Sequence, residues 1–251
     1  MISLRHLSAL SALFSCLSLV ACGGKGSPTG PSPTTTTGPT STPTTSTTTL
    51  TYAGIFAGPR LAGGRIQMSA TVTASTASLT SRPLAESSAT GTLSMADGTI
   101  VQLSGRYEST TKAFTLSGGP YAVSASVQGD AVTGSYTGPG NSSGGVSAFT
   151  SGAGKTPVVY CGTFDGPSQG RIKLTRLDST ISGYGTDAFG TVAVSGTVTG
   201  STVSMSFVPE PGHTGQVNGT LTGGQMSGTW SNTLKESGTW SAGSGGCGPA
   251  V

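Results

Sequence analysis

One five-residue pattern recurs along the chain: a large apolar residue, any residue, glycine, any residue, and a second large apolar residue. Alternation with period two marks a strand that buries one face, and the glycine always falls on that face. An inward glycine lets a strand bend and leaves room for a ring from across the interior, as small closed barrels require. The pattern therefore predicts β-barrel units. It occurs at 52–56, 103–107, 132–136, 160–164, 194–198, 217–221 and 226–230.

The chain also contains an internal repeat. The segment YAGIFAGP at 52–59 reappears as YCGTFDGP at 160–167, and Gly-Arg-Ile follows each copy shortly afterwards. We therefore expect two units, at 51–150 and 157–248, joined by a stretch rich in Gly and Ser.

The second unit divides into about eight short segments with strand character. Short connections between them favour hairpins between neighbours, and no segment shows a persuasive helical period. The predicted fold class is all-β, with two tandem antiparallel up-and-down (meander) β-barrel units of about eight short strands each, after a disordered tether. The strands expected in the second unit are 158–165, 170–175, 178–184, 190–198, 202–208, 214–221, 225–231 and 236–242.

The first residues have the character of a targeting segment. An apolar run from Leu7 to Val20 is too short to span a bilayer and fits the core of a signal peptide. It ends in Leu19-Val20-Ala21-Cys22, which resembles the lipobox of bacterial lipoproteins. The resemblance implies a signal peptide at 1–21, lipidation (palmitate) at Cys22, and a lipid-anchored protein of the bacterial cell envelope, at the outer membrane or cell surface. The alternative is an ordinary secretory signal in which Cys22 has no role.

A low-complexity stretch follows the lipobox. Every residue from Gly26 to Thr49 is Gly, Ser, Pro or Thr, so the segment has no side chains able to form a core. We assign 22–50 to the lipidated cysteine and a disordered tether. Twelve Lys and Arg are scattered against nine Asp and Glu, so no basic surface indicates a nucleic-acid partner.

We expect the four cysteines to have different roles. Cys16 lies in the signal segment and Cys22 is the lipid site, which leaves Cys161 and Cys247 as a pair. In an oxidising compartment we expect them to form a disulfide, with Cys161 facing outward and the bond holding the tail across the barrel seam.

The pentapeptide SGTWS occurs twice, ten residues apart, and carries the only two tryptophans, Trp230 and Trp240. Trp230 and Trp240 are separated by an even number of residues across a predicted hairpin, so we expect both rings on the inner face. With Phe164 and Tyr160 they either fill the core or line the mouth of the second barrel. The stretches LSGRYES at 103–109 and VTGSYTG at 132–138 resemble strands of avidin-type and lipocalin-type meander barrels, which implies the architecture and the possibility of a ligand between aromatic walls.

No catalytic constellation or metal-ligand cluster stands out, so the sequence predicts a protein without cofactors that is not an enzyme. We expect an envelope lipoprotein acting as a binding or structural module. One alternative is a carrier of a small apolar or glycan ligand in the second barrel. Another is an envelope hydrolase using Glu210 and His213, which lie three residues apart in a loop.

Overall fold

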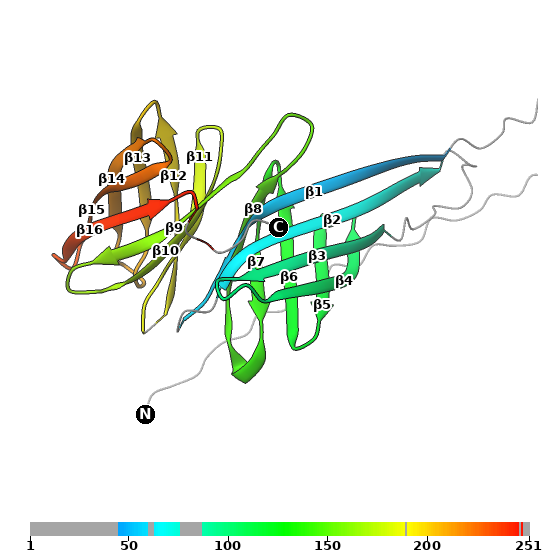
Figure 1. Ribbon diagram of the computed structural model, residues 1–251, viewed down its shortest axis with the longest axis horizontal. Helices are drawn as coiled ribbons and strands as arrows, with labels where there is room; N and C mark the ends of the chain where they lie inside the picture. The colour runs from blue at the N-terminus through cyan, green and yellow to red at the C-terminus, as the bar shows by residue number, and fades with distance from the viewer. Residues whose placement is uncertain (1–44, 60–62, 76–86, 189, 246, 248–251) are drawn as a thin grey trace, which may run out of the picture. The chain divides into compact units, whose positions relative to one another are not determined.

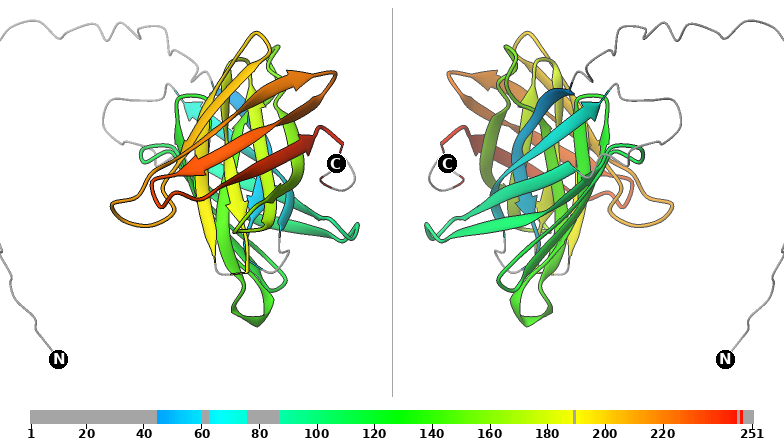
Figure 2. Two further views of the ribbon diagram at one scale, coloured as in Figure 1. Left: turned by 90° about the vertical axis from the view of Figure 1, so that its left-hand side faces the viewer. Right: turned by 90° about the vertical axis from the view of Figure 1, so that its right-hand side faces the viewer.

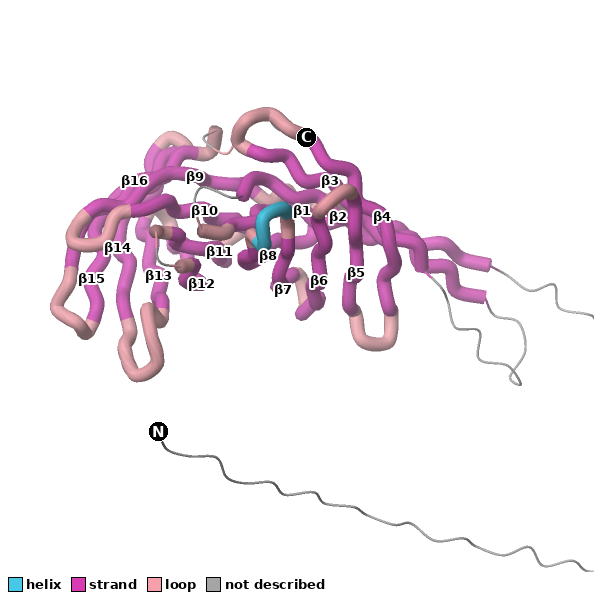
Figure 3. Tube along the Cα trace, turned by 90° about the horizontal axis from the view of Figure 1, so that it is seen from below, coloured by secondary structure: helices cyan, strands magenta, loops and turns pink. Residues whose placement is uncertain are grey.

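The computed structural model describes residues 45–59, 63–75, 87–188, 190–245 and 247. This part of the chain is nearly all strand, with one short 3-10 turn at Pro139–Asn141 (Figure 1, Figure 3). The first eight strands are β1 (Thr45–Ala57), β2 (Gly63–Ser75), β3 (Ser87–Met95), β4 (Ile100–Glu108), β5 (Ala113–Gly118), β6 (Tyr121–Gln128), β7 (Ala131–Thr137) and β8 (Ser143–Thr150). The second eight are β9 (Val158–Asp165), β10 (Gly170–Leu177), β11 (Thr180–Thr186), β12 (Thr191–Thr199), β13 (Thr202–Phe207), β14 (Gly215–Thr222), β15 (Gln225–Asn232) and β16 (Ser237–Gly243).

Each set of eight strands closes into an antiparallel barrel in which sequence neighbours pair. The first barrel closes where β1 pairs with β8, from Tyr52↔Thr150 to Ala57↔Gly145. The second closes where β16 pairs with β9. The strands run at a slant around each barrel, as closure requires (Figure 2). The predicted fold of two eight-stranded up-and-down barrels is confirmed.

The first barrel begins earlier than its predicted boundary. Strand β1 starts at Thr45, within the stretch assigned to the tether, and its first residues pair with the end of β2. Threonine is β-branched and suits a strand, so a run of threonines extends β1 once β2 offers a partner. The signal segment and Cys22 lie outside the described residues.

The recurring glycine pattern builds both cores. The large residues of all seven copies lie in the two barrel interiors, either buried or packed against the buried cluster. The glycines allow the backbones to approach closely. A Cβ built at Gly162 would lie 1.8 Å from the carbonyl oxygen of Ser241, and one at Gly228 would lie 1.9 Å from that of Asn218. Only glycine therefore fits at these two positions of the second barrel.

The two SGTWS segments form a hairpin of matching strands. Trp230 pairs with Gly238 and Trp240 pairs with Gly228, so the two rings form a diagonal cross-strand pair on the inner face. The serines and threonine of both copies are exposed. This arrangement confirms the orientation predicted from parity.

A third apolar cluster lies outside both interiors. It joins Ile55 and Ala57 of β1 with Val159 and Cys161 of β9, and includes Cys247. Cys161 and Cys247 form a disulfide with their Cα atoms 5.1 Å apart. Because Cys161 pairs with Gly243 at the closing seam, the bond fixes the tail beyond β16 to β9, as predicted. Val159 and Cys161 on the outward face of β9 are nevertheless buried, because the first barrel contributes residues that pack against them.

Polar groups extend this contact within one compact unit that contains both barrels. The hydroxyls of Ser147 and Ser182 lie 2.6 Å apart, and Tyr184 donates to the carbonyl oxygen of Val146 at 3.2 Å. Lys173 of β10 is only 5% exposed, and burial, followed by repulsion from Arg171, lowers its pKa to about 8. The contact between the barrels therefore includes an ionisable group held away from water.

Candidate functional site

The longer connections of the second barrel meet at one end, which we call the mouth. In an up-and-down barrel alternate connections lie on the same side, so the connections at 166–169, 187–190, 208–214 and 233–236 share this end. At the opposite end the chain turns within two residues at 178–179, 200–201 and 223–224. Tight turns at one end and longer loops at the other leave the mouth as the end able to carry a site.

A cavity of about 110 Å³ opens at the mouth. Its wall is mostly apolar side chains from the inner faces of the strands, and its rim is made by loop residues. The lining residues are Phe164, Ser168, Ile172, Gly185, Asp187, Gly190, Val192, Val194, Phe207, Pro209, Val217, Trp230, Asn232, Glu236 and Trp240. The interior of the second barrel is therefore not completely filled at this end.

The aromatic wall is held in place by the backbone. Trp230 Nε1 donates to the carbonyl oxygen of Asp165 at 3.0 Å, and Trp240 Nε1 donates to that of Asn218 at 3.1 Å. The Trp230 ring meets Phe164 and Phe207 edge to face, with centroids 6.3 and 6.4 Å apart. Because both indole N–H groups are already bonded, the tryptophans offer a ligand carbon surface rather than a donor.

The rim of the cavity is acidic. Asp187 accepts a hydrogen bond from Gly190 N at 2.8 Å, which closes the 187–190 turn. Asn232 donates to Glu236 Oε2 at 2.8 Å and accepts from Glu236 N at 3.1 Å, which closes the last hairpin. Both carboxylates are half-buried, and among the described residues no Lys, Arg or His lines the cavity. The mouth therefore presents negative charge beside an aromatic interior.

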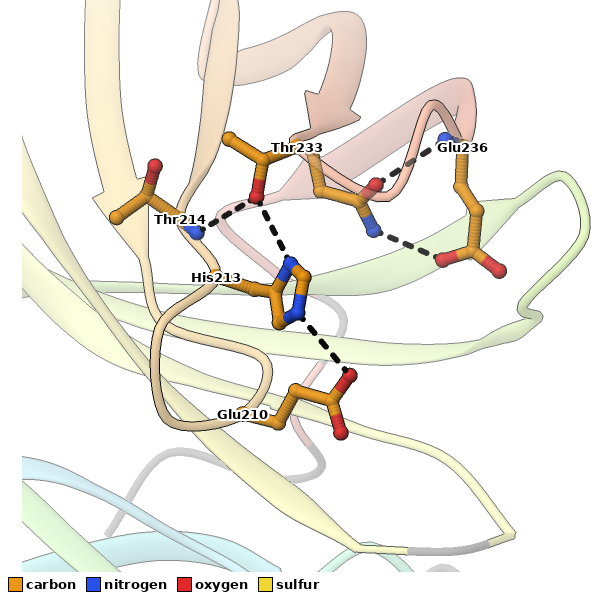
Figure 4. A network of polar contacts seen from close by, with 6 residues as sticks. Glu210, His213, Thr214, Thr233 and Glu236 are labelled. Atoms are coloured by element: carbon orange, nitrogen blue, oxygen red, sulfur yellow. Dashed lines mark hydrogen bonds and ion pairs between the residues drawn. The ribbon is translucent and has the colours of Figure 1, made fainter.

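A second polar network joins two of the mouth loops (Figure 4). His213 Nδ1 lies 3.2 Å from Thr233 Oγ1, and the same hydroxyl accepts a hydrogen bond from Thr214 N at 3.2 Å. Glu210 Oε1 lies 3.8 Å from His213 Nε2 on the outer side, where both side chains are more than one third exposed. The network links the 208–214 loop to the hairpin carrying Glu236.

The structure brings together three of the four predicted wall residues. Phe164, Trp230 and Trp240 line the cavity, whereas Tyr160 does not. Tyr160 is 3% exposed in the core, because it precedes Phe164 by four strand residues and lies that much deeper in the barrel.

Sequence reasoning missed Phe207 and the two carboxylates. Phe207 continues the inward alternation of Val203 and Met205, which is a usable signal. Asp187 and Glu236 lie in separate loops, so they meet only once the order of the strands around the barrel is known. Among residues 45–59, 63–75, 87–188, 190–245 and 247, no group of three or more His, Cys, Asp or Glu is placed to hold a metal ion.

Comparison with known proteins gives no match to a protein-family model, to a curated protein or to a solved structure. Within the described part of the chain, no helix has the length and apolar character needed to cross a membrane.

Proposed function

We propose that this chain is a non-enzymatic binding protein of the bacterial envelope, anchored by lipid at Cys22, whose second barrel takes up a small, largely apolar ligand at its mouth. The observation that supports the proposal is the cavity of about 110 Å³ walled by Phe164, Trp230 and Trp240. A barrel used only as a packed module has no need of an apolar space open to solvent.

The size of the cavity indicates the size of the ligand. An engineered apolar cavity of about 150 Å³ in another protein holds a benzene molecule. A space of about 110 Å³ open at one side therefore suits one ring or a short branched alkyl group, with the rest of the ligand at the rim. The largely carbon wall favours an apolar ligand over a glycan.

The hydrolase alternative has weaker support. Glu210, His213 and Thr233 align as carboxylate, imidazole and hydroxyl, but Thr233 Oγ1 already accepts a hydrogen bond from Thr214 N. Glu210 and His213 are also exposed rather than enclosed with a substrate. The arrangement supports a role in holding the two loops together.

The first experiment is native mass spectrometry of the full chain purified gently from its own envelope. The expected result is an additional small-molecule mass that is lost on mild activation. In parallel, benzyl alcohol is titrated into the ¹⁵N-labelled chain in detergent while the two tryptophan indole signals are followed by NMR. Both signals are expected to shift, because both rings line the cavity.

A matched pair of variants makes the titration specific. Val192→Phe enlarges a half-buried side chain of the lining, whereas Val208→Phe makes the same change at an exposed position outside it. Binding is expected to be lost in Val192→Phe and kept in Val208→Phe. Indole signals that do not respond to benzyl alcohol in any of the three proteins, with no copurifying mass, would rule the proposed function out.

A further inference from the structure

The charge at the rim of the cavity limits which ligands can bind, in addition to the apolar wall. The rim includes the carboxylates of Asp187 and Glu236 from two different loops, and no described lining residue is basic. The chain has only nine Asp and Glu in 251 residues, yet two of them lie at the rim of one small cavity. A ligand with an anionic group would meet repulsion here, whereas a cation would be attracted.

The carboxylates are held in place before any ligand binds. Gly190 N donates a hydrogen bond to Asp187 Oδ1. The Asn232 side chain donates to Glu236 Oε2 and accepts from the backbone N–H of Glu236. A carboxylate accepts about four hydrogen bonds, so the contact from Asn232 fixes Glu236 without using all of its acceptor capacity. Fixed acceptors bind a donor with a smaller loss of side-chain entropy.

The interior favours the same ligand chemistry. The faces of aromatic rings carry negative potential and attract a cation within about 6 Å, with tryptophan the strongest. Trp230 contacts both Phe164 and Phe207 in the wall of the same cavity that Asp187 and Glu236 line. The aromatic wall and the carboxylates therefore both favour a positive group in this cavity.

From these observations we propose that the ligand is a small organic cation, with one apolar ring or branched alkyl group in the cavity and a protonated amine at the rim, held by Asp187 and Glu236. The inference rests on the proposed function and specifies its substrate class. A primary or secondary ammonium donates charge-assisted hydrogen bonds to the carboxylates, which are stronger than bonds between neutral groups.

The test compares three probes of the same ring size and different charge: benzylamine, benzyl alcohol and benzoate. Each is titrated into the full chain under the indole NMR assay. Benzylamine is expected to bind about tenfold more tightly than benzyl alcohol, and benzoate most weakly. Equal affinity for benzylamine and benzyl alcohol would overturn the cation assignment and leave the proposed function standing.

Variants identify the groups responsible. Asp187→Asn and Glu236→Gln keep the shape and an acceptor oxygen for the existing contacts but remove the charge. Each is expected to bring the affinity for benzylamine toward that of benzyl alcohol, and binding of benzyl alcohol should persist as the control for folding. Asp178→Asn makes the same change in the 178–179 turn at the opposite end of the barrel, outside the lining, and should have no effect.

Two further outcomes would overturn part or all of the inference. A benzylamine preference that survives both rim substitutions would overturn the roles assigned to Asp187 and Glu236. Failure of all three probes to shift the indole signals at millimolar concentration would overturn the inference together with the proposed function, because the cavity would then accept no ring of this size.

Discussion

At the scale of single residues, glycines decide how closely the strands of the second barrel approach the aromatic wall. Gly238 pairs with Trp230, and a Cβ there would lie 1.8 Å from the carbonyl oxygen of Asp165 and 2.7 Å from Trp230 Nε1. At Gly185, which lines the cavity, an added Cβ would meet only Phe164, at 3.7 Å. Neither glycine has a positive φ, so steric contact alone distinguishes them.

We therefore predict opposite results for two alanine substitutions. Gly238→Ala forces the seam apart and disturbs the hydrogen bond of Trp230, which should lower the free energy of unfolding by about 2 to 3 kcal/mol. Gly185→Ala should change stability by less than about 1 kcal/mol but weaken binding of benzyl alcohol, because the methyl group occupies cavity space. Urea denaturation measures the first effect and indole NMR the second. Equal stability of the two variants would contradict this account of the seam.

At the scale of elements, the mouth loops depend on contacts between loops rather than within them. Thr233 Oγ1 joins His213 and Thr214 to the last hairpin. We predict that Thr233→Val, which keeps the shape and removes both contacts, will speed amide hydrogen exchange in residues 208–214 severalfold. Thr229→Val, an exposed threonine on β15 outside this network, is the control. Unchanged exchange in Thr233→Val would mean that the loop is ordered by other contacts.

The elements themselves were largely predictable from the sequence. The alternation of inward-facing residues, together with the turn residues, predicted the strand ends of the second barrel to within about two residues. The cavity was not predictable, because it depends on how far rings such as Phe207 and Trp230 fill the mouth, and on loops that converge only after closure. Burial of Cys161 was missed for a similar reason: the apolar residues that cover it, Ile55 and Ala57, lie about one hundred residues away in the other barrel.

At the scale of the whole molecule, the contact between the barrels makes stability depend on pH. Burial lowers the pKa of Lys173 to about 8, whereas an unfolded lysine titrates near 10.4. Between these values the unfolded chain binds a proton that the folded chain does not, so the free energy of unfolding rises with pH. Above about pH 10 the sign reverses, because burial raises the pKa of Tyr136 to about 12 and also raises that of Tyr184. These phenols resist ionisation only in the folded state.

We therefore predict a stability maximum near pH 10, in a chain whose formal net charge is only +3 at pH 7. Urea denaturation across pH 7 to 11 should show the free energy of unfolding rising by up to about 3 kcal/mol between pH 8 and 10, and then falling. Lys173→Met should abolish the rise, because no amine is then buried between the barrels. Lys155→Met, which removes a partly exposed amine paired with Asp130, should preserve it. A wild-type profile that is flat from pH 8 to 10 would show that the Lys173 amine keeps its proton on folding, and would contradict the lowered pKa.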